Sequence, residues 1–348
     1  MKVLHVMAGG EHGGAETMFV DAIVALHEAG VEQQVVTRHS EIRDPVWNRL
    51  GIPAHYAAFP SLLGLRTRSV LQRARKAFKP DVTQFWMSRA SSYAKPDSSP
   101  NIGWFGGDYD LKKYKNCQYY IGVTRDLGRH ISEASGKPDA VAVVHTYANI
   151  DPDAHPIDRA VFDTPADAPL LLALARLHPK KGLDVLLKAL LDIPNAWLWI
   201  AGEGPLRNEL MEQTAALGLQ NRVRFLGWRT DRETLLRTAD ICVFPSRYEP
   251  FGTVMVEAWM TGVPLIAAAA AGPKAYLEPE KNGLLVEIDD VQGLAAAIRR
   301  CLAEPELCAR LIEGGLRTYQ TTFTKEVLAR DSIAFYRRVV EQYAASTK

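Results

Sequence analysis

The chain has 348 residues, which gives room for about two domains of ordinary size, each able to bury its own core. Its 41 basic and 40 acidic side chains leave a net charge of +1. The charged fraction of 23% and the hydrophobic fraction of 47% are those of an ordinary globular protein. The composition therefore argues against a disordered chain and against a general nucleic-acid binder.

The cysteines and the apolar segments indicate the compartment. Four scattered cysteines lack the Cys-x-x-Cys spacing of zinc or redox sites, so we expect reduced, structural thiols. The amino-terminal run lacks the apolar core of a signal peptide, and no apolar stretch is long enough to cross a bilayer. We therefore expect a cytoplasmic protein, with room for a peripheral association with the inner face of the cytoplasmic membrane.

Short apolar runs alternate with amphipathic helical segments along almost the whole chain, which is typical of parallel sheets with crossover helices. In the first half, strands are expected at 2–8, 33–37, 81–86, 101–105, 119–123 and 140–144. In the second half, they are expected at 170–175, 196–202, 223–227, 241–245 and 263–269. The sequence thus predicts two doubly wound α/β domains, whose ligands bind beyond the carboxyl ends of the strands.

Two features mark the limits of these domains. Residues 146–168 are rich in Pro and Asp and lack periodicity, so they are expected to connect the domains. After about residue 288 only helical patterns remain. The last of them, 326–344, carries a broad apolar face that another element must cover.

A glycine-rich loop, residues 9–14, follows the first expected strand. Glycines let a ligand approach the backbone, and the N-terminus of the next helix offers N–H groups to an anion or to sugar hydroxyls. A tight strand-to-helix turn also requires glycine, so both roles stay open for Gly13 and Gly14. The loop lacks the Gly-Lys-Ser/Thr ending of a P-loop, and Thr37-Arg38 ends the next strand without the acid that would hold NAD.

Residues 246–264 are the most informative stretch. Glu249 precedes the turn Phe251-Gly252-Thr253, and Glu257 lies in the helix that follows. A carboxylate can accept two hydrogen bonds from vicinal sugar hydroxyls, and the N–H groups of the turn suit a phosphate. Two glutamates near a helix start can also form a solvated face, but Gly, Phe, Pro and Trp neighbours are unusual on a surface. The pattern favours a nucleotide-sugar site.

Basic residues follow the expected strand 170–175. Arg176 and Lys181 are expected at the carboxyl edge of the second sheet, where paired cations can neutralise a diphosphate leaving group. Lys180 competes with Lys181 for this role, and a solvated basic loop is the alternative. A further glycine turn at Gly202 does not complete a dinucleotide fingerprint, because Arg207 stands where the third glycine belongs. For that turn a structural role is the stronger interpretation.

Together these motifs resemble the retaining nucleotide-sugar glycosyltransferases of family four, which have the GT-B fold. The similarity rests on Arg176, Lys181, the turn 201–207, the run 223–228, and above all Glu249 separated by seven residues from Glu257. It covers nearly the whole chain. It implies two Rossmann-like domains facing a cleft: an acceptor domain, 1–150 with a returning helix at 331–348, and a donor domain, 151–330.

The resemblance also implies roles for individual residues. Arg176 and Lys181 would hold the diphosphate, Glu249 the transferred sugar and Glu257 the ribose. The remaining donor contacts implied are the backbone near Trp228 for the base, Phe251, Gly252 and Thr253 for the phosphates, and the glycine turns at Gly13, Gly14 and Gly202.

The amino half matches the family less firmly. Many members carry a histidine near the reacting centre, but this chain has Gly106 and Gly107 followed by Asp108. Asp108 is the candidate for orienting the acceptor hydroxyl, with Arg89 as a second acceptor contact, and a helix N-cap is the alternative for Asp108. The stretches around Arg89 and Asp108 are similar to bacterial lipopolysaccharide-core and related envelope glycosyltransferases.

Residues 108–110 spell the Asp-x-Asp that chelates manganese in the other major glycosyltransferase fold. We interpret this match as accidental, because the remaining donor motifs point to a metal-independent enzyme. No other cluster has metal-ligand spacing, and we expect neither a metal nor a cofactor.

A basic tract runs from Pro45 to Pro80, 36 residues with seven Arg or Lys and no acid. An apolar helical face is expected at Val70, Leu71, Ala74, Ala77 and Phe78, and the basic residues Arg66, Arg73, Arg75, Lys76 and Lys79 are expected largely outside it. The tract either attracts anionic lipid headgroups or a phosphorylated acceptor, or is the solvated side of an ordinary crossover helix.

These observations predict a retaining, metal-independent hexosyltransferase. Its donor is expected to be a nucleoside-diphosphate sugar, UDP-linked by preference, and its acceptor a hydroxyl of an envelope glycolipid or oligosaccharide such as lipopolysaccharide core. No nucleic-acid partner is expected. A nucleotide-sugar epimerase of the same fold and a non-catalytic nucleotide-sugar-binding protein are the alternatives.

Overall fold

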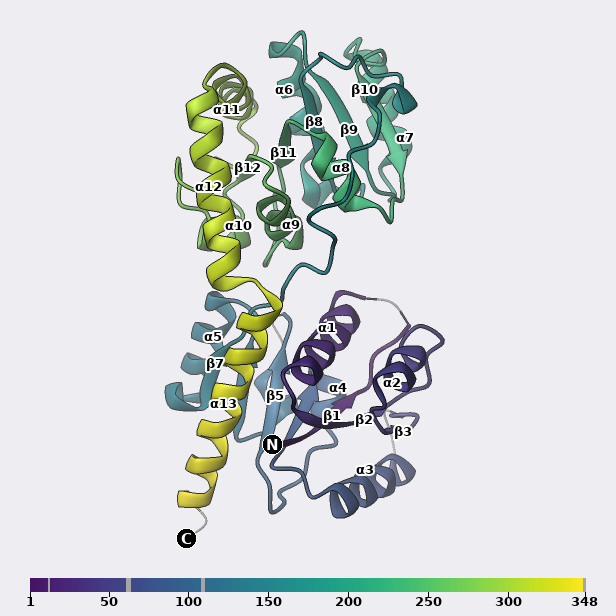
Figure 1. Ribbon diagram of the computed structural model, residues 1–348, viewed down its shortest axis with the longest axis vertical. Coiled ribbons are helices and arrows are strands. Elements are labelled where there is room, and N and C mark those ends of the chain that lie inside the picture. The colour runs from purple at the N-terminus through teal and green to yellow at the C-terminus, as the bar shows by residue number, and fades with distance from the viewer. Residues whose placement is uncertain (12, 61–63, 108–109, 347–348) are drawn as a thin grey trace. The chain divides into compact units, whose positions relative to one another are not determined.

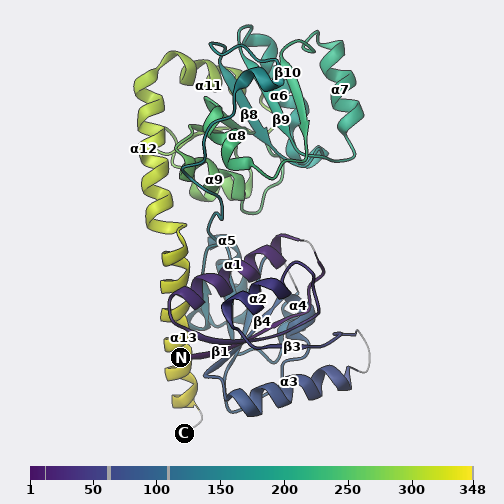
Figure 2. The same ribbon diagram turned by 45° about the vertical axis from the view of Figure 1, so that its right-hand side comes forward.

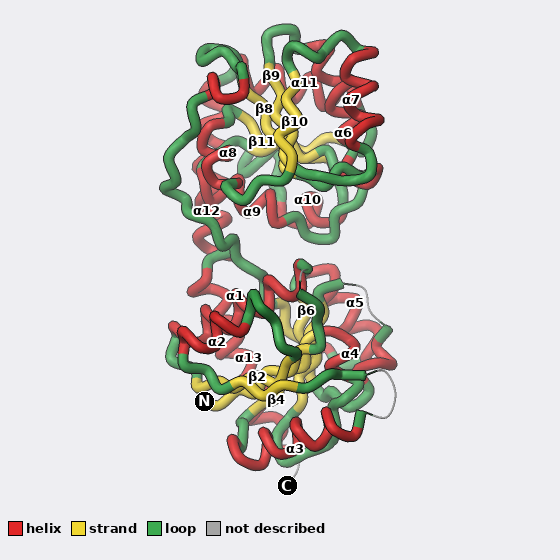
Figure 3. The backbone as a smooth tube through the Cα atoms, turned by 90° about the vertical axis from the view of Figure 1, so that its right-hand side faces the viewer, coloured by secondary structure: helices red, strands yellow, loops and turns green. Residues whose placement is uncertain are grey.

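The computed structural model describes residues 1–11, 13–60, 64–107 and 110–346. The chain divides into two compact units: unit 1 comprises Met1–Tyr147 and Thr324–Lys348, and unit 2 comprises Ala148–Phe323. Each unit contains one parallel sheet with helices on both sides (Figure 3). The chain is therefore an α/β protein with two Rossmann-like units, as the alternating pattern predicts.

Unit 1 has a seven-stranded sheet in the order β3-β2-β1-β4-β5-β6-β7. Its strands are β1 (Lys2–Met7), β2 (Glu32–Thr37), β3 (Ala54–Tyr56), β4 (Val82–Trp86), β5 (Asn101–Phe105), β6 (Tyr119–Gly122) and β7 (Val141–Val143). Its helices are α1 (Gly14–Glu28), α2 (Asp44–Leu50), α3 (Leu65–Phe78), α4 (Met87–Ser91), α5 (Arg125–Ser135) and α13 (Lys325–Ser346), with short 3-10 turns η1 (Leu111–Tyr114) and η2 (Pro138–Ala140).

The central strand β1 is buried on both faces. Val3 and Met7 belong to the core on the α1 side, whereas Leu4 and Val6 belong to the core on the α3 side. Successive strand side chains point to opposite faces, so a strand covered on both sides needs an unbroken apolar run. The sequence supplies this run, which is why the strand could be predicted.

One polar residue, His5, interrupts that run. Its Nε2 lies 3.0 Å from Gln33 Oε1, and its Nδ1 accepts a hydrogen bond from Trp86 Nε1 at 3.2 Å. Burial lowers the pKa of His5 to about 3, although the hydrogen bond with Gln33 acts in the opposite direction and raises the pKa. The ring is therefore neutral at physiological pH.

The last helix, α13, packs within unit 1 beside α1 (Figures 1 and 2). Leu328, Phe335 and Val339 join the same core as α1 and β1. Tyr336 Oη donates a hydrogen bond to Gln84 Oε1 on β4 at 2.5 Å. The apolar face expected at the end of the chain is thus covered by the core of the first unit.

Two side chains of the basic tract, Arg75 and Ala77, differ from the expectation. Arg75 was expected outside the apolar face of its helix, but on α3 it is only 7% exposed. Its guanidinium is buried because polar partners surround it: Asp97 Oδ2 lies 3.1 Å away and Thr83 Oγ1 accepts a hydrogen bond at 3.2 Å. Ala77, expected to be apolar and covered, is exposed instead.

Unit 2 has a six-stranded sheet in the order β10-β9-β8-β11-β12-β13. Its strands are β8 (Leu170–Leu174), β9 (Trp197–Ala201), β10 (Val223–Gly227), β11 (Ile241–Phe244), β12 (Leu265–Ala268) and β13 (Leu284–Val286). Its helices are α6 (Leu183–Ala189), α7 (Arg207–Ala216), α8 (Arg232–Thr238), α9 (Thr253–Thr261), α10 (Ala271–Tyr276), α11 (Val291–Ala303) and α12 (Pro305–Thr322), with 3-10 turns η3 (Arg159–Phe162), η4 (Pro179–Lys181) and η5 (Leu190–Asp192).

Two strands, β3 and β13, were not expected from the sequence. Each has three residues and lies at an edge of its sheet. Three residues are too few to show periodicity. The edge strand β7 has the same length but was expected, because it lies in the apolar run 140–144. Beyond β13 the described chain is helical, as predicted.

Two cysteines lie in the cores of the two units. Cys117 and Cys242 are free and buried, and burial raises the pKa of each thiol to about 12. Over the described ranges, no helix is both long and apolar enough to cross a membrane.

Candidate active site

The sheet of unit 2 has a topological switch point at β8. The chain goes from β8 to β9 on one side, and β11 later pairs with β8 on the other side. The loops after β8 and β11 therefore leave the carboxyl edge in different directions, which is where open α/β sheets bind ligands. Arg176 and Lys181 follow β8, and Glu249 follows β11.

These two loops are fastened to each other through their backbones. The N–H groups of Arg247 and Tyr248 donate to the carbonyl oxygen of Lys180 at 2.9 and 3.1 Å. Gly182 has a φ of 63°, and a Cβ at this position would lie 2.1 Å from the carbonyl oxygen of Pro245. Only glycine fits there, so the close approach of the loops requires it.

The Arg247 side chain also links the loops after β8 and β11. Its guanidinium forms a bidentate pair with Asp184 at 2.7 Å and pairs with Asp289 Oδ1 at 2.6 Å. It also donates to the carbonyl oxygen of Pro179 at 2.7 Å. Hydrogen bonds from Arg247 lower the pKa of Asp184 below its ordinary value. The backbone that carries Lys181 is therefore held firmly in place.

The two lysines predicted for one role lie in different environments. Lys181 Nζ lies 2.5 Å from Glu249 Oε2, and both side chains are largely buried. Lys180 Nζ instead lies over the ring of Tyr248, 4.5 Å from its centroid. Arg176 is exposed, and its guanidinium has no hydrogen bond or ion pair within the described part of the chain. Lys181 is thus the cation that meets a predicted site glutamate.

The helix α9 begins at Thr253, shortly after Glu249. Gly252 precedes it with a φ of 93°, and no side chain caps its first N–H groups. The ring of Phe251 is buried against Tyr276 and Phe323, with ring centroids 5.7 and 5.8 Å away. Phe251 is therefore part of the core, and the turn offers backbone N–H groups, with Thr253 as its first helical residue.

Glu257, one turn into α9, is 3% exposed. Its Oε1 accepts a hydrogen bond from Arg232 Nη1 at 2.6 Å, whereas its Oε2 has no partner among the described residues. Burial raises the pKa of Glu257 above its ordinary value, and the charge of Arg232 opposes this effect. A buried carboxylate oxygen without a donor is rare and marks a place where a ligand hydroxyl can bind.

Three residues of this site were not predicted from the sequence. Arg232 holds Glu257, Arg247 fastens the loops, and Ser246 has a buried hydroxyl without a partner among the described residues. Ser246 and Arg247 lie within the stretch that contains Glu249, so their position was a usable signal. Nothing in the sequence links Arg232 to Glu257, because the contact joins two helices.

Gly202 and Trp228 lie after neighbouring strands. Gly202 has a φ of 148°, and a Cβ there would lie 2.0 Å from the carbonyl oxygen of Ala175. Backbone packing between the loops after β8 and β9 accounts for this glycine. Trp228 follows β10, and its side chain is 77% exposed. It is the most exposed tryptophan or other large hydrophobic residue in the described part of the chain.

In unit 1, the glycine-rich loop is held by its own helix. Glu16 Oε1 accepts a hydrogen bond from the N–H of Gly10 at 2.9 Å, so this N–H already has an acidic partner. Arg43 Nη1 donates to the carbonyl oxygen of Gly10 at 2.5 Å. Gly13 has a φ of 155° before α1, and a Cβ there would clash with the carboxylate of Glu16. A Cβ at Gly14 would meet no atom within 4 Å. The packing of Glu16 therefore accounts for Gly13, and the ligand contact expected at Gly13 and Gly14 stays a prediction.

Of the two predicted acceptor residues, Arg89 lies at the carboxyl edge of the same sheet. Arg89 is exposed on α4, directly after β4. Asp108 lies outside the described residues. The capping role considered for it belongs to Asp110, whose Oδ1 accepts a hydrogen bond from the N–H of Lys112 at 2.9 Å.

Across the described ranges, no group of three or more His, Cys, Asp or Glu could hold a metal ion.

Comparison with known proteins identifies the family. Residues 155–318 match the family described as Glycosyl transferases group 1. Over 343 residues the chain is 36% identical to the lipopolysaccharide core biosynthesis glycosyltransferase LpsD of Rhizobium meliloti, which spans 98% of this chain and 99% of that relative. The chain belongs to the group 1 glycosyl transferases. The glycosyltransferase family that the combined motifs resemble is therefore confirmed, whereas the retaining chemistry expected with it stays a prediction.

Solved structures agree with the fold of this glycosyltransferase. A glycosyltransferase from Rickettsia africae has a TM-score of 0.84 and 19% sequence identity, over 98% of each chain. HepE of Anabaena, solved in complex with UDP, has a TM-score of 0.79 and 21% identity, over 96% of this chain and 98% of that one. These similarities show the two-domain GT-B fold.

Proposed function

We propose that this glycosyltransferase is a retaining, metal-independent enzyme that takes a sugar from a UDP-sugar. The acceptor is a hydroxyl of an envelope glycolipid or oligosaccharide, such as lipopolysaccharide core. Unit 2 binds the donor and unit 1 binds the acceptor. The name of LpsD and the UDP in the structure of HepE support the choice of acceptor class and nucleotide.

The observation that carries this proposal is the pair of glutamates beside the uncapped start of α9. Glu257 Oε2 is a buried acceptor without a donor, and it suits the hydroxyls of a ribose. Glu249 stands at the other side of the Gly252 turn and suits the hydroxyls of the transferred sugar. The N–H groups at the start of α9 lie between them in sequence and suit phosphate oxygens.

The leaving diphosphate needs positive charge that does not come from a metal. Arg176 and Lys181 supply two cations at the same sheet edge, and the N-terminus of α9 adds its partial positive charge. Fixed donors of this kind stabilise developing negative charge more than water does, because they do not reorganise during the reaction. Trp228 offers its backbone to the base.

Retention follows from attack and departure on the same face of the sugar. The bond between the anomeric carbon and the phosphate oxygen breaks, the bond to the acceptor oxygen forms, and the leaving phosphate oxygen takes the acceptor proton. Glu249 is paired with Lys181, which suits a positioning contact better than a nucleophile. Asp108 and Arg89 orient the acceptor.

The enzyme is proposed to bind its acceptor at an anionic membrane surface. The exposed cations of α3, among them Arg66 and Arg73, point away from the core and can attract a negatively charged membrane. Each such cation near the surface contributes about 1 kcal/mol.

The function is tested by incubating the enzyme with UDP-sugars, GDP-sugars and a truncated lipopolysaccharide core in the presence of EDTA. We expect transfer from a UDP-sugar, insensitive to the chelator, with the anomeric configuration of the donor kept in the product as read by NMR. An inverted product would contradict the retaining mechanism, and loss of transfer in EDTA would contradict metal independence. Conversion of the donor without an acceptor would favour an epimerase.

A further inference from the structure

A pocket of about 820 Å³ lies in unit 1, and none of the candidate active-site residues lines it. Its walls come from α3, from residues 93–100 before β5, and from the end of α13. Asp81 and Pro100, which line it, directly precede β4 and β5. The strands are parallel and the glycine-rich loop follows β1, so the pocket lies at the opposite edge of the sheet.

The pocket has an excess of positive charge. The basic residues that line it are Arg68, Arg75, Lys76, Lys79 and Lys95, and the acidic ones are Asp81 and Asp97. Both acids are engaged: Asp81 accepts a hydrogen bond from the N–H of Lys2 at 2.7 Å, and Asp97 pairs with Arg75 at 3.1 Å. The other four cations are exposed, and no side chain among the described residues pairs with them.

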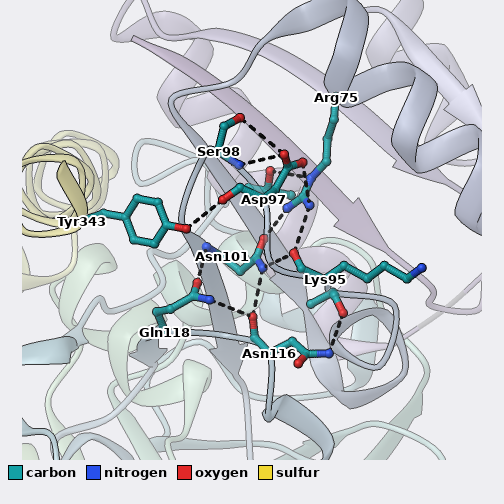
Figure 4. A network of polar contacts seen from close by, with 10 residues as sticks. Arg75, Lys95, Asp97, Ser98, Asn101, Asn116, Gln118 and Tyr343 are labelled. Atoms are coloured by element: carbon teal, nitrogen blue, oxygen red, sulfur yellow. Dashed lines mark hydrogen bonds and ion pairs between the residues drawn. The ribbon is translucent and has the colours of Figure 1, made fainter. Parts of the chain in front are cut away.

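A network of polar contacts fixes the wall that carries Lys95 (Figure 4). Arg75 donates to the carbonyl oxygen of Lys95 at 3.3 Å and to the side-chain oxygen of Asn101. Asn101 Nδ2 donates to the same carbonyl oxygen at 2.8 Å. Tyr343 Oη, from α13, donates to the carbonyl oxygen of Asp97 at 2.7 Å. Three elements therefore hold the segment around Lys95 in one conformation.

Lys79 is held in a conformation that lysine seldom adopts. It ends α3 with a φ of 51°, and its N–H donates to the carbonyl oxygen of Arg75 at 2.8 Å. Glycine would take this left-handed position without strain, whereas a residue with a Cβ costs about 1 kcal/mol. The chain nevertheless has lysine here, and its side chain lines the pocket.

The cluster is more than a set of charges at a helix end. Lys76 and Lys79 lie near the C-terminus of α3, where cations are favourable in any case. Lys95 comes from a different segment, and Arg68 lies in the first turn of α3, far from that end. Both line the same cavity, so the cations converge on a shared volume.

We propose that this pocket is a second binding site, specific for a phosphate group carried by a soluble metabolite or by a lipid headgroup. Lys76, Lys79 and Lys95 donate to the phosphate oxygens, and the buried Arg75 positions the wall without contacting the ligand. The proposal does not depend on the donor site, because all of its residues belong to unit 1 and to the opposite edge of the sheet.

The test is isothermal titration with inorganic pyrophosphate at low salt. It uses the full chain carrying Lys181→Ala, which removes a cation of the candidate active site. Adding Lys76→Glu and Lys95→Glu is expected to weaken binding by about tenfold or more, since charge-assisted contacts are lost and repulsion replaces them. Lys113→Glu, exposed on η1 and outside the pocket, is expected to stay within about twofold.

Vesicle sedimentation separates the two sources of the phosphate. Binding to phosphatidylglycerol vesicles, but not to phosphatidylcholine vesicles, assigns a lipid headgroup if it is lost with Lys76→Glu and Lys95→Glu and kept with Lys113→Glu. Pyrophosphate binding without this pattern assigns a soluble ligand. Equal weakening by Lys113→Glu, or no binding to either probe, would overturn the site. UDP binding by the unmodified chain is measured in parallel, so failure of this site and failure of the proposed function are told apart.

Discussion

Lys181 Nζ lies 2.5 Å from Glu249 Oε2, although the two residues follow different strands, β8 and β11. An ammonium group has three N–H donors, so Lys181 can keep Glu249 and still donate to a phosphate. The pair therefore links the proposed contact for the leaving diphosphate to the proposed contact for the sugar. Neither side chain is positioned by its own loop alone.

Lys181→Ala is expected to lower kcat/KM for transfer by about 100-fold, because it removes a donor to the developing charge and leaves Glu249 without its cation. The matched control is Lys180→Ala. Lys180 lies next to it in the chain but over the ring of Tyr248, so this variant should keep most of the activity. Steady-state rates and the Tm of both variants check the prediction, and equal losses in the two would refute the assignment of Lys181.

Glu257→Gln is expected to weaken UDP binding by about tenfold, because an amide keeps the volume but accepts fewer hydrogen bonds than a carboxylate. The fold should survive, since the partner Arg232 is partly exposed and can reach water. Titration calorimetry with UDP measures the effect. Unchanged affinity would mean that the unpartnered Glu257 Oε2 faces no ligand.

The same variant should change how stability depends on pH. Burial raises the folded-state pKa of Glu257 above its unfolded value, so the buried group favours folding only when protonated. Its contribution is present below about pH 4.3, the ordinary pKa of a glutamate, and is lost as the pH rises through the folded pKa. The Tm of Glu257→Gln should therefore gain on that of the wild type as the pH rises over this window. Parallel curves would contradict the burial of a charged group.

Arg247→Ala is expected to lower the free energy of unfolding by about 2 kcal/mol, because it breaks the bidentate pair with Asp184 and frees the loop of Lys181. Asp184 has a lowered pKa in the folded state, so its contribution is present above its unfolded pKa and is lost as the pH falls below about 3.9. The two stability curves should converge there. Arg317→Ala, which breaks an exposed pair with Glu313, should cost less than about 0.5 kcal/mol.

Because of His5, we expect a separate decrease in the free energy of unfolding at acidic pH. Its pKa falls from 6.5 to about 3 on folding, so its contribution is present above pH 6.5 and is lost as the pH falls toward 3. In His5→Gln, an amide can still donate to Gln33 and accept from Trp86. Urea unfolding of this variant should show a flatter dependence on pH below 6.5. An unchanged slope would show that other groups cause the loss.

The fold could be predicted wherever burial shapes the sequence itself. Strands covered on both faces, such as β1 and β8, must be continuous apolar runs, so their positions can be predicted from the sequence. The three-residue edge strands β3 and β13 are fixed by pairing with a neighbour and leave no such pattern. Arg75 was misplaced because its burial depends on Asp97 and Asn101, which approach only after folding.

Some residues of the candidate site could also be predicted from the sequence, and others could not. Glu249 and Glu257 lie in one continuous stretch, 246–264, and Lys181 follows the apolar run of β8, so their spacing can be read along the chain. The partner of Glu257 could not be read, because Arg232 reaches it across two helices. Asp108 lies outside the described residues, so its proposed role with the acceptor still depends on the sequence.

We propose that the carboxyl edge of the unit 2 sheet binds the donor nucleotide without a metal. Titrating UDP into the wild-type protein in EDTA, with Lys181→Ala and Glu257→Gln alongside, tests this most directly. At about 100 times the dissociation constant, UDP should also stabilise the fold by about 2.7 kcal/mol. We predict chelator-insensitive binding of one UDP per chain, weakened in both variants. No binding in EDTA, or equal affinity in all three proteins, would contradict the claim.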